Sequence, residues 1–216
     1  MNVQLQLLQT SAKDAAVAED AFMTISSLIL GELHRGRWSS SFGAYHSSPF
    51  SVMDERFEKY AGHLMEFVFS ALRTLDEFQV FSAAVGVTGD LARAIQKQIQ
   101  PYAEPLLQAL LAALSSPVLH RTAKPTVVSV FGDIAIALGP GFTPYLQNVM
   151  GMLSQAGQVK AEANSDAGMI DFVWAMRESI AEAFIGILTG LQEQRKRSPH
   201  CSGHQVVVLK SSFQSL

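Results

Sequence analysis

The sequence repeats itself at a fixed spacing of 43 residues, and a repeat of this kind constrains the fold before any single motif does. Moving the chain by 43 positions against itself places Gly89-Asp90 on Gly132-Asp133 and Pro101-Tyr102 on Pro144-Tyr145. Between Ala83 and Ala113 the shift produces ten identities, where composition alone gives about two. Many of the remaining pairs exchange one apolar residue for another, so the pattern of buried positions repeats as well.

A second match shows a third unit upstream. A shift of 42 places Tyr60-Ala61 on Tyr102-Ala103 and Ala71-Leu72 on Ala113-Leu114. A period of this size is typical of HEAT and armadillo repeats, in which each unit is two antiparallel helices that bury their apolar faces only by stacking. We therefore expect an all-α fold, a right-handed α-α superhelix of HEAT (armadillo-type) repeats with about three to four helix pairs.

Helical periodicity, caps and breakers place the individual helices. In residues 13–32 apolar side chains recur every three or four positions, as one buried face requires. Asp54, Asp76 and Asp166 are suitable N-caps for three others. Ser116-Pro117 and the run from Gly139 to Gly141 break the chain between helices. The expected helices are 13–32, 54–73, 76–97, 100–114, 118–138, 143–155 and 166–193.

Two segments depart from the repeat. Residues 33–53 are rich in serine and glycine and are longer than the few residues that normally join two helices of a repeat. Residues 194–216 continue no repeat. We therefore expect one solenoid segment over 13–193, with an atypical insert at 33–53 and an irregular C-terminal tail at 194–216.

Composition excludes several classes of function. The formal net charge of −3 and pI of about 6.1 give no basic face for a nucleic acid, so we expect no direct nucleic-acid partner. The single cysteine, Cys201, excludes an intramolecular disulfide, and cytosol or nucleus is the expected location. The N-terminus lacks the pattern of a signal peptide, and the uninterrupted apolar runs are too short to cross a bilayer. No membrane insertion is expected.

Several stretches resemble one family. The run from His120 to Ala156, HRTAKPTVVSVFGDIAIALGPGFTPYLQNVMGMLSQA, is similar to importin-β, and its portion at Lys124 to Asp133 is more specific than a general HEAT pattern. FSAAVGVTGDLARAI at 81–95, FEKYAGHLM at 57–65 and MRESIAEAFIGILTGL at 176–191 support it, in the order of the C-terminal half of that family's solenoid. The resemblance covers about 15–191 except the insert.

This resemblance implies a function in nuclear transport. Members of the family are far longer, so the chain corresponds to a fragment of such a receptor. The implied partners are importin-α or cargo with basic localisation signals, Ran-GTP, and phenylalanine-glycine nucleoporins. In the family the second helix of each pair lines the concave surface that holds cargo, and clefts between first helices take up phenylalanine-glycine repeats. The implied location is cytoplasm and nucleus, including nuclear envelope pores.

Four residues are candidate partner-binding positions. Glu66, Glu104 and Gln108 fall on expected second helices and are placed to face a basic ligand, although an ordinary solvated helix face explains them as well. Trp174 on the last helix is a candidate for part of a partner pocket, with a buried or half-buried packing role as the alternative.

Other residues receive structural interpretations. Asp90 and Asp133 share one phase of the repeat, which favours a repeated hydrogen-bonding role near the turn into the next helix. Tyr60, Tyr102 and Tyr145 share another phase, which favours the core between helices. The basic run at 195–197 suits a helix C-terminus.

No chemistry of catalysis is expected. The sequence contains no phosphate-binding loop, no His-Glu-x-x-His and no Gly-x-Ser-x-Gly. His200, Cys201 and His204 are possible metal ligands, but zinc needs a fourth, so we expect no metal and no cofactor. The chain is interpreted as a binding protein rather than an enzyme. The alternatives are a HEAT-repeat scaffold subunit for another protein complex, or an inactive truncated product.

Overall fold

The computed structural model describes residues 18–26, 51–161 and 166–197, with side chains at 18–26, 61–161 and 166–192. All regular structure in these residues is helical, which confirms the all-α prediction. The insert at 33–50, the tail from residue 198 and the possible ligands His200, Cys201 and His204 lie outside the described residues.

Helices follow one another with short connections. After the helical residues 18–26, the order is α3 (Ser51–Ala71), α4 (Phe78–Ile95), the 3-10 helix η1 (Gln96–Ile99), α5 (Gln100–Ser115), η2 (Arg121–Ala123), α6 (Lys124–Leu138), η3 (Gly139–Tyr145), α7 (Leu146–Gly157) and α8 (Ala167–Arg197).

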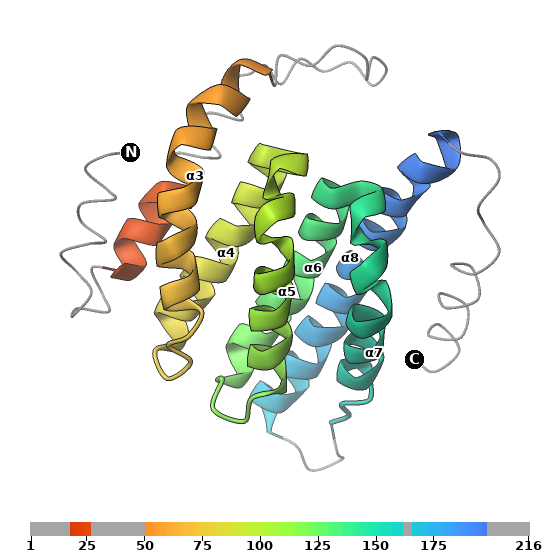
Figure 1. Ribbon diagram of the computed structural model, residues 1–216. Coiled ribbons are helices and arrows are strands. Elements are labelled where there is room, and N and C mark those ends of the chain that lie inside the picture. Colours follow the sequence, from red (N-terminus) through yellow and green to blue (C-terminus); the bar gives the residue numbers. More distant parts are fainter. Residues whose placement is uncertain (1–17, 27–50, 162–165, 198–216) are drawn as a thin grey trace, which may run out of the picture.

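The helices form two layers (Figure 1). Helices α3, α5 and α7 lie side by side in one layer, here called the second-helix layer, and α4, α6 and α8 lie in the other, the first-helix layer. Helix α6 packs against α4 on one side and α8 on the other, and residues 18–26 reach α4 through Ser26. Consecutive helices thus alternate between layers, as a stack of two-helix repeats requires.

Several helix boundaries differ from the predictions. Helix α3 begins at Ser51, inside the expected insert, so Asp54 does not cap it. Glu77 rather than Asp76 occupies the N-cap position of α4, and it makes no side-chain capping bond. The expected cap at Asp166 is present, because its Oδ1 accepts the backbone N–H of Met169 at 3.0 Å. Helix α8 runs on to Arg197 through residues of good helix propensity, so 194–197 are helical rather than irregular.

The two helices of the third unit start later than expected. Helix α6 begins at Lys124 rather than 118 because Pro125 fits the first turn of a helix, and η2 precedes it. Helix α7 begins at Leu146 rather than 143, since the chain after Leu138 continues as η3. The other ends agree closely, as for α5, which spans Gln100–Ser115.

The core lies between the two layers and repeats with the sequence. Leu91 in α4 and its repeat partner Ile134 in α6 are fully buried, as are Leu110 and its partner Leu153 in the second-helix layer. Tyr102 and Tyr145 are partly buried and pack against this core, as predicted; the side chain of Tyr60 is outside the described set.

Glycines at one phase of the repeat allow the first helices to approach one another. A Cβ atom at Gly89 would lie 2.8 Å from Asp133 Oδ2 of α6, and one at Gly132 would lie 3.1 Å from Ala183 Cα of α8. The two glycines are 43 residues apart and therefore perform the same task in successive repeats.

Contact between α6 and α8 is closer still. A Cβ at Gly186 would lie 2.5 Å from Gly132 Cα, and one at Gly190 would lie 2.2 Å from the carbonyl oxygen of Ala135. Gly186 and Gly190 are one helical turn apart, so they leave a single groove along α8 into which the α6 backbone fits. We call the residues Gly132, Ala135, Gly186 and Gly190 the glycine seam.

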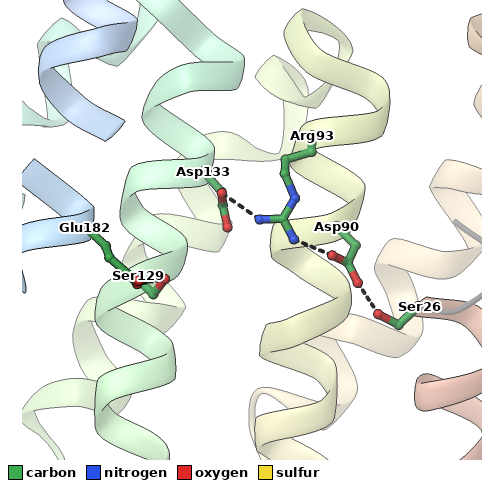
Figure 2. Close-up of polar contacts among 6 residues, drawn as sticks. All are labelled: Ser26, Asp90, Arg93, Ser129, Asp133 and Glu182. Carbon is green, nitrogen blue, oxygen red and sulfur yellow. Dashed lines mark hydrogen bonds and ion pairs between the residues drawn. The ribbon is translucent and has the colours of Figure 1, made fainter. Parts of the chain in front are cut away.

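Polar side chains connect the same layer elsewhere (Figure 2). Asp90 of α4 accepts hydrogen bonds from Ser26 and Arg93, and Arg93 Nη1 lies 2.8 Å from Asp133 Oδ1 of α6. Ser26, Asp90, Arg93 and Asp133 are here called the ladder. The hydrogen-bonding role predicted for Asp90 and Asp133 is present, but their partners lie on neighbouring first helices rather than at the turn into the next helix.

Burial perturbs the charged groups of the ladder. Burial raises the pKa of Asp133 above its ordinary value of 3.8, although the charge and hydrogen bond of Arg93 oppose this rise. Partial burial lowers the pKa of Arg93, but Asp133 and Asp90 outweigh it, so its pKa is raised. The charge of Arg93 and its hydrogen bond to Asp133 therefore favour the carboxylate form of this half-buried residue.

One stretch is apolar enough to require an explanation. By length and composition alone, Arg121–Gly157 could cross a membrane. The stretch was not noticed in the sequence because polar residues interrupt its apolar runs, although its average hydropathy is high. In the structure this stretch is divided into η2, α6, η3 and α7, and 61% of its most apolar window is buried inside the fold. Packing between the layers accounts for its composition.

Candidate protein-binding surface

The second-helix layer carries three of the four candidate residues. Glu66 on α3 and Glu104 and Gln108 on α5 are all solvent-exposed, so their side chains are available to a partner. Gln108 Nε2 donates to Glu104 Oε1 at 3.3 Å, which is the contact expected for residues four apart on a helix. This bond holds the Glu104 carboxylate beside an amide on the same face.

Charge is sparse and negative on two of the three helices of this layer, α5 and α7. Helices α5 and α7 together contain a single charged residue, Glu104. Their exposed polar side chains are otherwise mainly amides, namely Gln100, Gln108, Gln147, Asn148 and Gln155. An amide-lined surface with isolated carboxylates accepts hydrogen bonds from backbone N–H, lysine and guanidinium groups. It therefore fits an extended basic peptide better than an acidic one.

Trp174 lies on the other layer, at α8, and is 65% exposed. The alternative of a buried or half-buried packing role is therefore wrong for this residue, because Val173 and Met176 supply the buried face of α8 and Trp174 points away from it. Arg177 lies over the indole ring at 5.8 Å from its centroid, a cation–π contact that limits the motion of the ring.

Two further apolar side chains on α8 are exposed. Ile170 is 42% exposed and lies one helical turn before Trp174, and Ile185 is 65% exposed. The four candidate residues therefore do not form one site. Glu66, Glu104 and Gln108 mark the second-helix layer, and Trp174 marks an apolar face of the first-helix layer.

Arg93 and the glycine seam both organise the first-helix layer, and neither was predicted from the sequence. Arg93 has no counterpart one repeat later, where Ile136 stands, so periodicity could not indicate it. The glycine seam had a usable signal, the Gly-x-x-x-Gly spacing of Gly186 and Gly190 in a helical stretch. Within the described part of the chain, no group of three or more histidine, cysteine, aspartate or glutamate side chains is placed to hold a metal ion.

Comparison with known proteins identifies the family. Residues 42–202 match the family model described as importin subunit beta-1-like, TPR repeats. The chain belongs to the importin-β family. The repeats of this importin-β segment have a period of 42 to 43 residues, which is that of HEAT rather than of the 34-residue tetratricopeptide repeat.

Curated relatives give the same result. Importin subunit beta-1 of Schizosaccharomyces pombe is 36% identical over 196 residues, which is 91% of this chain and 20% of the relative. Importin subunit beta-1 of Arabidopsis thaliana is 38% identical over 141 residues, covering 65% of this chain and 16% of the relative. The chain thus spans about a fifth of the length of these importin-β proteins.

Solved structures show the same helix arrangement. A Kap95:Nup1 complex matches with a TM-score of 0.70 and 26% identity over 90% of this chain and 20% of that chain. A structure of Kap95p with RanGDP matches with a TM-score of 0.69 and 28% identity over 91% and 20%. Importin beta crystallised in ammonium sulfate matches with a TM-score of 0.66 and 27% identity, over 98% of this chain and 23% of that chain. The HEAT-repeat prediction is therefore confirmed.

Proposed function

We propose that this chain is part of an importin-β-type nuclear transport receptor and acts by reversible protein binding, without catalysis and without a cofactor. The observation that carries the proposal is the match to the importin-β family model over residues 42–202. The proposed locations are accordingly the cytoplasm, the nucleus and the pores of the nuclear envelope.

The second-helix layer is the proposed contact for a basic ligand, either importin-α or a cargo with a basic localisation signal. Glu66 and Glu104 attract lysine and arginine side chains, and Gln108 adds a hydrogen-bonding amide beside Glu104. Because these carboxylates are exposed, each contributes modestly, and affinity depends on several repeats acting together.

The first-helix layer is the proposed contact for phenylalanine-glycine nucleoporins. A structural relative is a complex with Nup1, and Trp174 with Ile170 offers an exposed apolar surface on α8. A phenyl ring has no room between α6 and α8, because their backbones touch at Gly132 and Gly186. The ring is therefore expected to lie against Trp174 on the outer side of α8.

A Ran interaction is the third part of the proposal. It is supported by the Kap95p structure with RanGDP, which this chain matches over 91% of its length. The proposed state is Ran-GTP, the form expected from the family resemblance. Among the described residues nothing separates the two nucleotide states, so both are included in the test.

A capture experiment with matched variants tests these contacts. The purified chain is passed over immobilised basic segment of importin-α, a phenylalanine-glycine nucleoporin peptide, and Ran loaded with GTP or with GDP. We expect charge reversal by Glu66→Lys and Glu104→Lys together to weaken capture by the importin-α segment about fivefold. Trp174→Ala is expected to weaken capture by the nucleoporin peptide alone.

Glu178→Lys is the matched control, since Glu178 is exposed on α8, outside the second-helix layer. It reverses one charge without altering the proposed basic-ligand surface. Failure of a helical, folded chain to bind any of these baits would count against transport and favour a scaffold for another complex or an inactive product.

A further inference from the structure

A groove of about 710 Å³ lies at one edge of the solenoid, where α5 turns into α6 and α7 turns toward α8. This edge is at the bottom of Figure 1. Five parts of the chain line the groove: the end of α5, the turn at 117–121, the first residue of α6, the last turns of α7 with Val159 just beyond them, and the first turns of α8. Of the exposed amides of the second-helix layer, Gln155 alone lines the groove, and Trp174 does not line it.

The floor of the groove is apolar and rich in methionine. Met152 of α7 and Met169 and Met176 of α8 line it together with Phe172. Met176 is buried, whereas Met152, Met169 and Phe172 are partly exposed. Methionine side chains are flexible and polarisable, so such a floor can adapt to different bulky apolar or aromatic groups.

The rim of the groove is basic. Among the described residues that line it, His120, Arg121 and Lys124 are the charged or titratable ones, and none is a carboxylate. Arg121 lies 3.6 Å from Asp166; because both side chains are substantially exposed, this ion pair is weak, and an incoming carboxylate can compete for the guanidinium group. Among the described residues Lys124 has no carboxylate partner; its Nζ donates to the carbonyl oxygen of Ser116 at 3.3 Å.

The rim is held in place by local contacts. His120 Nδ1 accepts the backbone N–H of Thr122 and so caps η2, and its ring packs on Phe78 with centroids 4.9 Å apart. Pro125 fixes the start of α6 directly after Lys124. The basic groups are therefore positioned before a ligand arrives, which lowers the entropy lost on binding.

We propose that this groove binds an acidic peptide segment of a partner protein, whose bulky apolar side chain enters between Met152, Met169 and Phe172 while its carboxylates pair with Arg121 and Lys124. Charge complementarity selects this occupant: the rim is positive in a chain whose net charge is −3. The ligand is opposite in charge to the one proposed for the second-helix layer, so the groove and that layer select different peptides.

Peptide binding followed by fluorescence anisotropy tests the proposal. The probe is a synthetic peptide with one phenylalanine flanked on both sides by glutamates. Two matched peptides replace either the phenylalanine by serine or all glutamates by glutamine. We expect each change to weaken binding by about tenfold, because the anchor and the carboxylates act together.

Variants of the chain locate the site. Arg121→Glu and Lys124→Glu together are expected to weaken binding about tenfold, and Lys97→Glu, which reverses an exposed charge in η1 outside the groove, is expected to leave it unchanged. Circular dichroism verifies that each variant is folded. If the double variant unfolds, Lys124→Gln provides the same comparison with a smaller loss.

Methionine methyl resonances give a readout that does not depend on substitution. With methyl-labelled methionine, addition of the phenylalanine peptide is expected to shift the signals of Met152, Met169 and Met176 and to leave that of the buried Met65 in α3 unchanged. Equal binding of the serine peptide, equal binding by the double variant, or no binding at all would each overturn the proposal.

Discussion

Gln96 and Gly139, one repeat apart, adopt the same unusual backbone conformation. Gln96 has φ 49° and ψ −124°, and Gly139 has φ 54° and ψ −124°. Each residue ends a first helix by donating its backbone N–H to a carbonyl four residues earlier, Ala92 and Ala135 respectively. The repeat therefore conserves the geometry of this turn while changing the residue that adopts it.

This pair gives the first prediction. Positive φ at ψ near −120° is comfortable for glycine and strained for glutamine, so Gln96→Gly is expected to stabilise the fold by about 1 kcal/mol after the entropic cost of glycine is deducted. Gly139→Ala is expected to destabilise the fold by about 1–2 kcal/mol, because alanine is strained at this positive φ. Steric overlap adds nothing, since the new Cβ would make only an ordinary contact. Urea unfolding followed by circular dichroism measures both, and a destabilised Gln96→Gly would contradict the explanation.

The glycine seam gives the second prediction. Gly186→Ala places a Cβ 2.5 Å from Gly132 Cα and must separate α6 from α8, at a cost of about 3 kcal/mol. Gly151→Ala is the matched control, because nothing lies within 4 Å of its Cβ on the exposed side of α7. We expect this control to stabilise the chain by about 0.5 kcal/mol through helix propensity alone. Similar thermal shifts for both variants would refute the close approach of the two backbones.

The ladder gives a prediction about pH. The folded-state pKa of Asp133 is raised above 3.8, so its protonated form stabilises the fold below pH 3.8, and this contribution is lost as the pH rises through the folded-state pKa. Arg93 lowers that pKa, so Arg93→Met is expected to raise it further and to make the loss of stability with rising pH steeper. At neutral pH the substitution is expected to cost about 1 kcal/mol.

Urea unfolding between pH 4 and pH 7 measures this effect. Adding Asp133→Asn to Arg93→Met removes the titrating group, and the extra pH dependence is expected to disappear in the double variant. If Arg93→Met and the parent chain show parallel pH profiles, Arg93 does not control the ionisation of Asp133.

Trp174 gives a prediction about exposure. In a chain carrying Trp38→Phe, the fluorescence of Trp174 is expected to be quenched readily by acrylamide, because the side chain is 65% exposed. Trp174→Ala is expected to change stability by less than about 0.5 kcal/mol, as for other surface substitutions. A blue-shifted, protected emission would show that Trp174 is packed against another part of the chain.

The repeat predicted the layered helix stack, because the buried positions follow the 43-residue period. This period indicates which helix is the first or second of each pair, the order of the helices and which helices pack together. It also predicted the shared roles of Asp90 with Asp133 and of Tyr102 with Tyr145. Helix starts were less accurate, because capping depends on contacts outside the pattern. The cap of η2 is His120, a residue without strong capping preference that gains its position from Phe78.

The surfaces could be predicted only in part. Exposure of Glu66, Glu104 and Gln108 follows from their places on polar helix faces, whereas that of Trp174 depends on how α8 is rotated against α6. The groove could not be predicted from the sequence, for a different reason. Lys124, Met152 and Phe172 come together only once three helix ends are packed at one edge, and no local pattern encodes that meeting.

The glycine seam also determines where this stack can bend. Two backbones in contact leave no side chain between them that could change rotamer. Helices α6 and α8 are therefore expected to move together as one rigid body. Between α4 and α6 the long, half-exposed side chain of Arg93 spans the gap, and such a link can lengthen or re-aim without breaking the core. Bending of this part of an importin-β superhelix is therefore expected to concentrate between α4 and α6. The stiffness of this contact is expected to fall as added salt screens the ion pairs of Arg93.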